Sequence, residues 1–115
     1  MILDNAFDIN SVKELVKTVV NEAKDLAYVI NVELKCDEER FKRYAIKFLI
    51  HQEEPMTKTR AQKIEETLDI LAKDPNYKQI YSTLMNSYNY IRKIAGKENY
   101  SPEAKQENPS HLGES

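Results

Sequence analysis

The sequence is poor in the residues that make turns, disulfides and membrane spans. Its 115 residues include two Gly, one Cys and no Trp. So few glycines argue against a turn-rich β-sandwich, and a lone cysteine, Cys36, cannot close a disulfide within the chain, which favours a reducing, cytoplasmic setting. No apolar run approaches the roughly 18 residues that span a bilayer, and residues 1–10 lack the Lys or Arg of a signal peptide. We therefore expect a soluble helical domain with no membrane partner.

The same shortages argue against catalysis. Two glycines, at positions 96 and 113, cannot build a glycine-rich phosphate loop. One cysteine and two histidines, His51 and His111, do not supply the ligands of a typical zinc site. Adjacent carboxylates such as Glu65 and Glu66 point about 100° apart on a helix, so they form solvated faces rather than acid–base pairs. The sequence predicts a protein that is not an enzyme and that holds no metal or cofactor.

The strongest periodic pattern predicts a long first helix. Ser11-Val-Lys-Glu14 has the spacing of a capping box, and apolar residues then recur at spacings of four and three, as in a coiled coil. These residues are Val12, Val16, Val19, Ala23, Leu26 and Ile30. The helix is expected from about Val12 to about Leu34, a length of about 35 Å. A seam of that length needs a partner, which is either another helix of the chain or a second copy of the protein.

Capping residues predict three shorter helices. Asp37 is an N-cap for a helix over residues 38–52, whose expected apolar face includes Phe41, Tyr44 and Phe48. Thr59-Arg-Ala-Gln62 is a second capping-box pattern, with Thr57 as the rival N-cap, for a helix that ends at about Lys73.

Asp74 and Pro75 predict the start of the last helix, which Gly96 ends. Tyr77, Tyr81 and Tyr88 lie on its apolar seam and are expected in the core or in an oligomer interface. Residues 1–10 then form an N-terminal arm, residues 11–96 a single helical domain, and residues 97–115, rich in Glu, Asn, Ser and Pro, a disordered tail. The expected fold class is all-α, either a helical bundle or a dimeric coiled coil.

Basic residues are concentrated in one part of a chain whose net charge is −2. From Lys35 to Lys63 there are eight Lys and Arg against five Asp and Glu, and Arg40, Arg43, Lys47 and His51 fall on one helical face. Such a row, continued at the start of the next helix, is typical of phosphate contacts on duplex nucleic acid. The candidate DNA-binding residues are Arg40, Lys42, Arg43, Lys47, Lys58, Arg60 and Lys63. An ordinary solvated helix face would also explain the row, and the acidic net charge argues against DNA.

Several short segments carry a resemblance to known DNA-binding families. They are Lys13-Glu-Leu-Val-Lys17, Glu22-Ala-Lys-Asp25, Asp37-Glu-Glu-Arg-Phe41-Lys-Arg43, His51 and Ile64-Glu-Glu-Thr-Leu-Asp-Ile-Leu71. With extra residues between Asp25 and Asp37, residues 13–71 resemble the small double-stranded-DNA-binding proteins of T-even-type phages, the DsbA type, which are associated with late promoters. A looser similarity exists to the GapR-type nucleoid proteins of bacteria, helical oligomers that bind duplex DNA. The tyrosine-rich last helix and the tail have no counterpart.

The resemblance implies a non-enzymatic protein that binds duplex DNA largely without sequence preference, in the host cytoplasm if the chain is phage-encoded, as an accessory to transcription or nucleoid structure. We expect a homodimer in which paired first helices hold two basic helices against the phosphates. The alternative is a small helical protein that acts on a protein partner through its acidic or tyrosine-rich surface, as phage-encoded inhibitors and bacteriocin immunity proteins do. The net charge favours the alternative, and the placement of the bases favours DNA.

Overall fold

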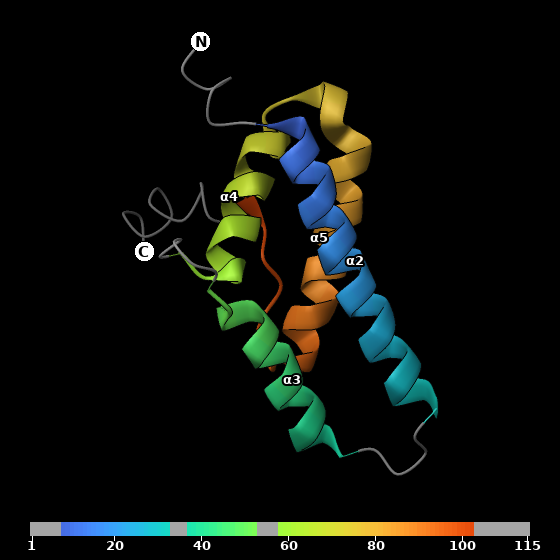
Figure 1. The fold of residues 1–115 in the computed structure, drawn as a ribbon. Helices are drawn as coiled ribbons and strands as arrows, with labels where there is room; N and C mark the ends of the chain where they lie inside the picture. The colour runs from blue at the N-terminus through green and yellow to red at the C-terminus, as the bar shows by residue number, and fades with distance from the viewer. Residues whose placement is uncertain (1–7, 33–36, 53–57, 103–115) are drawn as a thin grey trace, which may run out of the picture.

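The computed structural model of the protein describes residues 8–32, 37–52 and 58–102. The chain runs down one long helix, α2 (Ile9–Val32), and returns through α3 (Glu38–Ile50) and α4 (Arg60–Ala72). A 3₁₀ turn, η1 (Pro75–Tyr77), then leads into α5 (Lys78–Ile94), which descends beside α2 (Figure 1). The described residues contain helices and no strand. The predicted all-α class is confirmed, with a helical bundle as its form.

The first helix begins earlier than predicted, because its N-cap is Asp8 rather than Ser11. The Asp8 carboxylate accepts hydrogen bonds from the amide of Asn10 at 3.0 Å and from the hydroxyl of Ser11 at 3.0 Å. The amide of Val12 donates to the Asp8 carbonyl, which is the first bond of the helix. A carboxylate satisfies the orphan donors of a first turn at least as well as a hydroxyl does. The Ser11 capping box was therefore wrong.

The other predicted caps are present. Asp37 accepts from the amide of Arg40 at 3.3 Å. Thr59 and Gln62 form the reciprocal capping box, with bonds of 3.1 Å and 2.9 Å between side chain and backbone. Asp74 accepts from the amide of Asn76 at 2.9 Å, but it caps the 3₁₀ turn, so α5 itself starts three residues later than predicted.

The α3 and α4 helices form one broken rod. The α3 helix ends at Ile50, two residues before the predicted end, because His51 turns to an extended conformation with ψ 136°. The His51 carbonyl therefore no longer points along the helix axis, and it accepts a hydrogen bond of 2.7 Å from the amide of Arg60. This bond joins the end of α3 to the start of α4, so both helices run antiparallel to α5 along one side of the bundle (Figure 1).

The core forms around α5, which contacts each of the other three helices. The α2 seam faces α5, and Val19 is completely buried within the single chain. The seam that needed a partner thus finds it in the same chain. Its register differs slightly from the prediction, since Leu15 is buried while Val16 and Ile30 are half-buried. The main buried cluster also includes Phe48, Leu49, Ile64, Leu68, Leu71, Leu84, Tyr88 and Ile91.

Several apolar side chains lie outside this core. Tyr44, which the helical period placed on the apolar face of α3, is 53% exposed, so that prediction was wrong. Ile50 is 58% exposed at the end of the same helix, and Tyr28 and Val32 are exposed near the end of α2. The helical period fixes the direction of a side chain, but burial also needs a neighbouring element that reaches it.

Gly96 ends α5 as predicted. Its φ of 82° lies in the left-handed region, and the amides of Gly96 and Lys97 donate to the carbonyls of Lys93 and Arg92, which is the Schellman arrangement.

The segment after α5, which the sequence assigned to the tail, packs on the bundle as far as Pro102. Asn89 of α5 exchanges two hydrogen bonds with the backbone of Tyr100, at 2.7 Å and 3.2 Å. Pro102 is fully buried. The rest of the predicted tail, residues 103–115, and residues 1–7 of the predicted arm lie outside the described residues. None of the described helices combines the length and the apolar character needed to cross a membrane.

Candidate nucleic-acid interface

The outward face of α3 presents two exposed bases. Arg43 and Lys47 each follow a buried residue, Phe41 and Ala45, by two positions, which is about 200° around a helix. Packing of Phe41 and Ala45 into the protein therefore directs Arg43 and Lys47 away from it. Both side chains are exposed, so α3 places two positive charges one helical turn apart in solvent, as the sequence predicted.

Arg40 extends this face toward the start of α3, but it is half-buried. Its guanidinium carbon lies 5.2 Å from the centroid of the Phe41 ring, a cation–π distance. The packed stem and ring contact fix this arginine beside the core. Its contribution to an interface is therefore smaller than that of Arg43 and Lys47.

Lys42 points elsewhere. It lies against the end of α5: a Cβ atom added to Gly96 would come 3.2 Å from Cε and 3.5 Å from Nζ of Lys42. The ammonium is therefore close to the carbonyl end of α5, where the helix dipole favours a positive charge. Lys42 does not join the outward row of α3.

Lys58 is paired with a carboxylate. Its ammonium lies 2.6 Å from Glu66 Oε2, with both side chains about half exposed. An exposed pair of this kind contributes between 0 and about 1 kcal/mol to stability, but it neutralises the charge locally. Lys58 is thus a weak candidate for a phosphate contact.

Arg60 holds the joint between α3 and α4. Its guanidinium carbon is 4.3 Å from the centroid of the Phe48 ring, and its Nη1 donates to the Phe48 carbonyl at 3.4 Å. Burial, with a smaller effect of Asp25, raises the pKa of the Glu22 carboxyl, and the charge of Arg60 acts against this rise. Arg60 therefore links α4 to α3 and is electrostatically coupled to α2. This structural role was missed from the sequence, because Phe48 is twelve positions away and its pairing with Arg60 depends on the break at His51.

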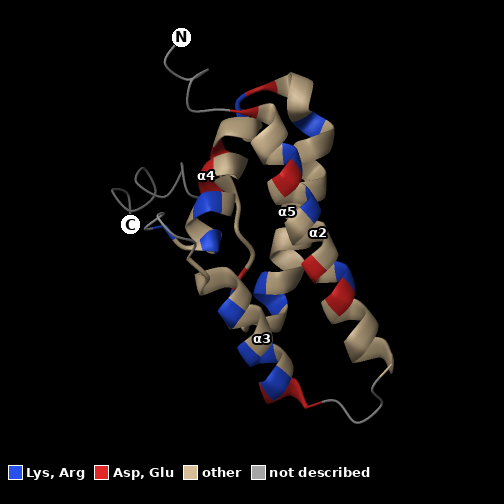
Figure 2. Ribbon diagram, in the orientation of Figure 1, with Lys and Arg blue, Asp and Glu red and all other residues tan. Residues whose placement is uncertain are grey.

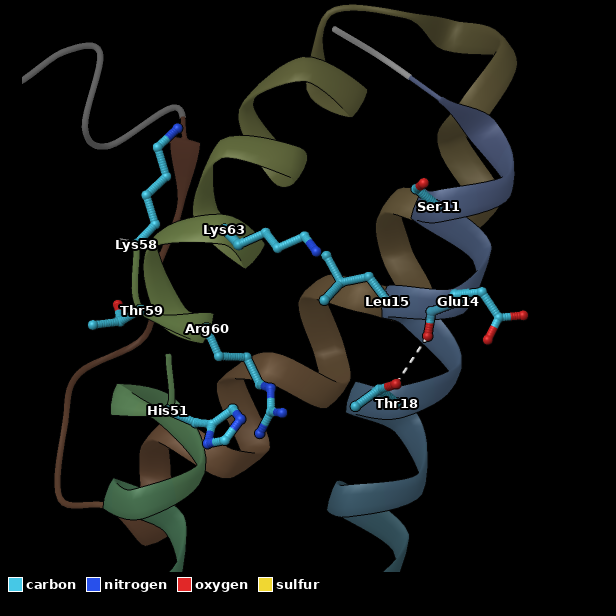
Figure 3. Close-up of a pocket in the computed structure, with 9 residues that line it drawn as sticks. All are labelled: Ser11, Glu14, Leu15, Thr18, His51, Lys58, Thr59, Arg60 and Lys63. Carbon is cyan, nitrogen blue, oxygen red and sulfur yellow. Dashed lines mark hydrogen bonds between the residues drawn. The ribbon is translucent and has the colours of Figure 1, made fainter. Parts of the chain in front are cut away.

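A cleft lies between α2 and the joint of α3 with α4. Its volume is about 320 Å³. The lining residues are Ser11, Glu14, Leu15, Thr18, His51, Lys58, Thr59, Arg60 and Lys63. Figure 3 shows Lys63 extended from α4 toward Leu15 of α2, with the imidazole of His51 beside the guanidinium of Arg60. The cleft brings together three of the predicted bases and His51, while Arg43 and Lys47 lie on the outer face of α3.

The charges are segregated along the rod of α3 and α4. Between Arg40 and Lys63 the described residues, 40–52 and 58–63, include seven Lys and Arg and no Asp or Glu. The next two turns of α4 carry Glu65, Glu66 and Asp69. Figure 2 shows this succession of Lys and Arg along α3 and into the first turn of α4, with acids before it at the start of α3 and beyond it on α4. The bases of α3 and α4 therefore lie between acidic residues at both ends.

The tyrosines of α5 belong to the protein interior. Tyr88 is completely buried, as the core interpretation predicted, and its ring meets that of Tyr100 edge to face at 6.1 Å. Its hydroxyl donates to Glu65, and burial together with this carboxylate raises the pKa of the phenol. Tyr81 and Tyr90 of α5, and Tyr77 of η1, are half-buried. The completely buried Tyr88 ring is not available for stacking on bases.

The described residues hold no group of three or more His, Cys, Asp and Glu arranged to bind a metal ion. No protein-family model, curated protein or solved structure matches this chain.

Proposed function

We propose that the chain binds duplex DNA through the phosphate backbone, largely without reading base sequence. The observation that carries the proposal is the pair of exposed bases, Arg43 and Lys47, one helical turn apart on the outward face of α3. Exposed Lys and Arg attract phosphates, and the exposed Glu38 and Glu39 in the first turn of α3 offset part of this charge. The resemblance of residues 13–71 to phage DNA-binding proteins points the same way.

The proposed mechanism is electrostatic. Arg40 to Lys47 spans about 10 Å along α3, so one copy reaches only a few phosphates. Each neutralised phosphate releases counterions, which drives association and makes it depend on salt. Phosphates are chemically alike along the duplex, so these contacts position the protein without discriminating bases.

The acidic part of α4 limits the contact to this face. Glu65, Glu66 and Asp69 follow the bases within two turns of the same helix, and like charge repels them from DNA. A second copy would double the number of phosphate contacts. The α2 seam is covered by α5, so pairing of first helices is not part of the proposal, and any homodimer would use another surface.

The direct test is a fluorescence anisotropy titration of the full chain against random-sequence duplex DNA at two salt concentrations. With two to four phosphate contacts, log affinity should fall against log salt with a slope of roughly −2 to −4. Duplexes of different sequence should bind alike. No affinity at low salt, or affinity that does not change with salt, would contradict the proposal.

Binding to a protein partner is the second candidate. The exposed Tyr28, Val32, Tyr44 and Ile50 support it, since they are large apolar side chains on α2 and α3 that a protein partner could cover. We therefore assign the candidate protein-binding surface to these residues rather than to the tyrosines of α5. If the chain shows no salt-dependent affinity for duplex DNA, this candidate takes the place of the first.

A further inference from the structure

The cleft between α2 and α4 is lined by more bases than acids among the described residues. Lys63 is half-buried, and among the described residues it has no ion-pair partner. Its side chain reaches toward the apolar Leu15, while the carboxylate of Glu14, the acid of the cleft lining, points away from it (Figure 3). A lysine buries its aliphatic stem on apolar surface and keeps its ammonium available for an anion. With Lys58, Arg60 and Lys63 against one acid, Glu14, in the described lining, the cleft favours an anionic ligand.

The other lining groups suit the same ligand. His51 and Arg60 add an imidazole and a guanidinium at one end of the cleft (Figure 3). The Phe48 ring and carbonyl hold Arg60 in position. The Arg60 side chain therefore loses little further conformational entropy when a ligand binds. The Thr59 hydroxyl oxygen accepts from the amide of Gln62, so its hydrogen remains for a ligand, whereas the hydroxyls of Ser11 and Thr18 already donate to Asp8 and to the Glu14 carbonyl. Bases together with a hydroxyl donor are the chemistry that recognises phosphate oxygens.

The size of the cleft limits the ligand. About 320 Å³ is at the lower end of the range of about 300 to 1,000 Å³ found for small-molecule pockets. The cleft accommodates a phosphate or pyrophosphate group and a part of what carries it. It is too small to enclose a large cofactor.

We propose that this cleft is a discrete binding site for a phosphate or pyrophosphate group, with Lys63 as its principal ligand residue. The site goes beyond the DNA-binding face, because it lies between α2 and α4 rather than on the outside of α3. The phosphate can belong to the DNA backbone or to a free ligand such as a nucleoside diphosphate. Both sources present the same oxygens to Lys63.

The test uses His51 as a reporter inside the cleft. The chain has two histidines, so His111→Gln in the full chain leaves His51 as the source of the imidazole NMR signals. Titration with inorganic pyrophosphate at constant ionic strength should shift these signals to saturation. No saturable shift would overturn the proposal.

A matched pair of variants assigns the effect to Lys63. Lys63→Gln should weaken pyrophosphate binding about tenfold or more, the loss expected for one charge-assisted hydrogen bond. Lys73→Gln removes the same charge from the other end of α4, about 15 Å along the helix, and should change the affinity less than twofold. Equal losses in the two variants would show that only the general surface charge attracts the anion, which would contradict a discrete site.

A short duplex distinguishes the two sources and separates this proposal from the DNA proposal. If duplex DNA shifts the His51 signals and Lys63→Gln abolishes the shift, a backbone phosphate occupies the cleft. If pyrophosphate alone shifts them, the ligand is a free one. Failure of pyrophosphate to bind overturns the cleft whatever the duplex affinity is, and absence of salt-dependent duplex affinity overturns the DNA proposal whatever pyrophosphate does.

Discussion

The hydroxyl of Tyr100 donates a hydrogen bond of 2.7 Å to Asp69 Oδ1. This bond ties the segment that follows α5 to α4, 31 positions earlier in the chain. Burial raises the pKa of the Tyr100 phenol, and the Asp69 carboxylate adds to the rise. The structured domain therefore extends past Gly96, at which the helical pattern of the sequence ends.

Replacing Tyr100 with Phe should measure this bond. Tyr100→Phe keeps the ring against Tyr88 but removes the hydroxyl, so the free energy of unfolding should fall by about 1.5 kcal/mol, the value for a bond to a charged acceptor. Urea denaturation followed by circular dichroism is the measurement. Tyr28→Phe is the matched control, because Tyr28 is 69% exposed and should be unaffected. Equal stability of the two variants would show that the segment is not held by this contact.

The N-cap of α2 can be assigned by two substitutions. Asp8→Ala removes the carboxylate that accepts from Asn10 and Ser11 and should lower the free energy of unfolding by about 1 kcal/mol. Ser11→Ala should cost less, since the hydroxyl only donates to Asp8. Thermal melting of both variants checks the order. A larger loss for Ser11→Ala would restore the capping box that the sequence pattern favoured.

The left-handed backbone conformation of Gly96 predicts that different substitutions there lower the stability to different extents. Gly96→Ala should destabilise the chain by about 1 kcal/mol, because φ 82° is unfavourable for a residue with a Cβ atom. The new Cβ would also lie 3.2 Å from Lys42 Cε, although a flexible lysine can move. Gly96→Asn should lose less, since Asn tolerates the left-handed region. Chemical denaturation of the two variants provides the comparison, and an alanine variant as stable as the original chain would contradict it.

Glu22 predicts a dependence of stability on pH. Its folded-state pKa is raised, chiefly by burial and then by Asp25, so the folded chain holds this proton more tightly than the unfolded chain does. The favourable contribution of Glu22 to the free energy of unfolding is present below pH 4.5, the pKa in the unfolded chain. It is lost as the pH rises through the higher pKa in the folded chain. Glu22→Gln should therefore raise the melting temperature at pH 7 relative to the original chain and have little effect at pH 3.5. A lower melting temperature at pH 7 would mean that attraction to Arg60 outweighs burial.

Short-range chemistry explains which parts of the fold the sequence predicted. Asp37, the Thr59–Gln62 pair and Gly96 act within about one helical turn of themselves, so their roles can be predicted from spacing alone. At the start of α2 the spacing is ambiguous, because Asp8 stands three positions before Ser11 and Ser11 three positions before Glu14. Whether Asp8 or Ser11 is the N-cap depends on which of them is the last residue with a non-helical backbone before α2. The residue spacing does not contain that information.

The candidate site divides in the same way. The helical period predicted correctly that Arg43 and Lys47 share an exposed face. It did not predict that Lys42 lies against Gly96, 54 positions away, or that Arg60 stacks on Phe48 across the break at His51. Those arrangements depend on how α3 packs against α4 and α5. The cleft lined by Lys63 is likewise a product of packing, since its walls come from α2, α3 and α4.

The central claim is that the outer face of α3 binds DNA phosphates. The most direct test compares the salt dependence of duplex binding for the original chain, for Arg43→Gln/Lys47→Gln, and for the matched control Lys13→Gln/Lys17→Gln, which removes two exposed bases with the same spacing from α2. All three should melt at nearly the same temperature, because exposed charges contribute little to stability.

Anisotropy titrations over a series of salt concentrations give the slope of log affinity against log salt for each chain. The α3 variant should bind weakly to every duplex, with a slope shallower by about 1.8, the equivalent of two lost phosphate contacts. The α2 control should keep the slope of the original chain. An unchanged slope in the α3 variant, or an equal loss in the α2 control, would contradict the assignment of DNA binding to α3.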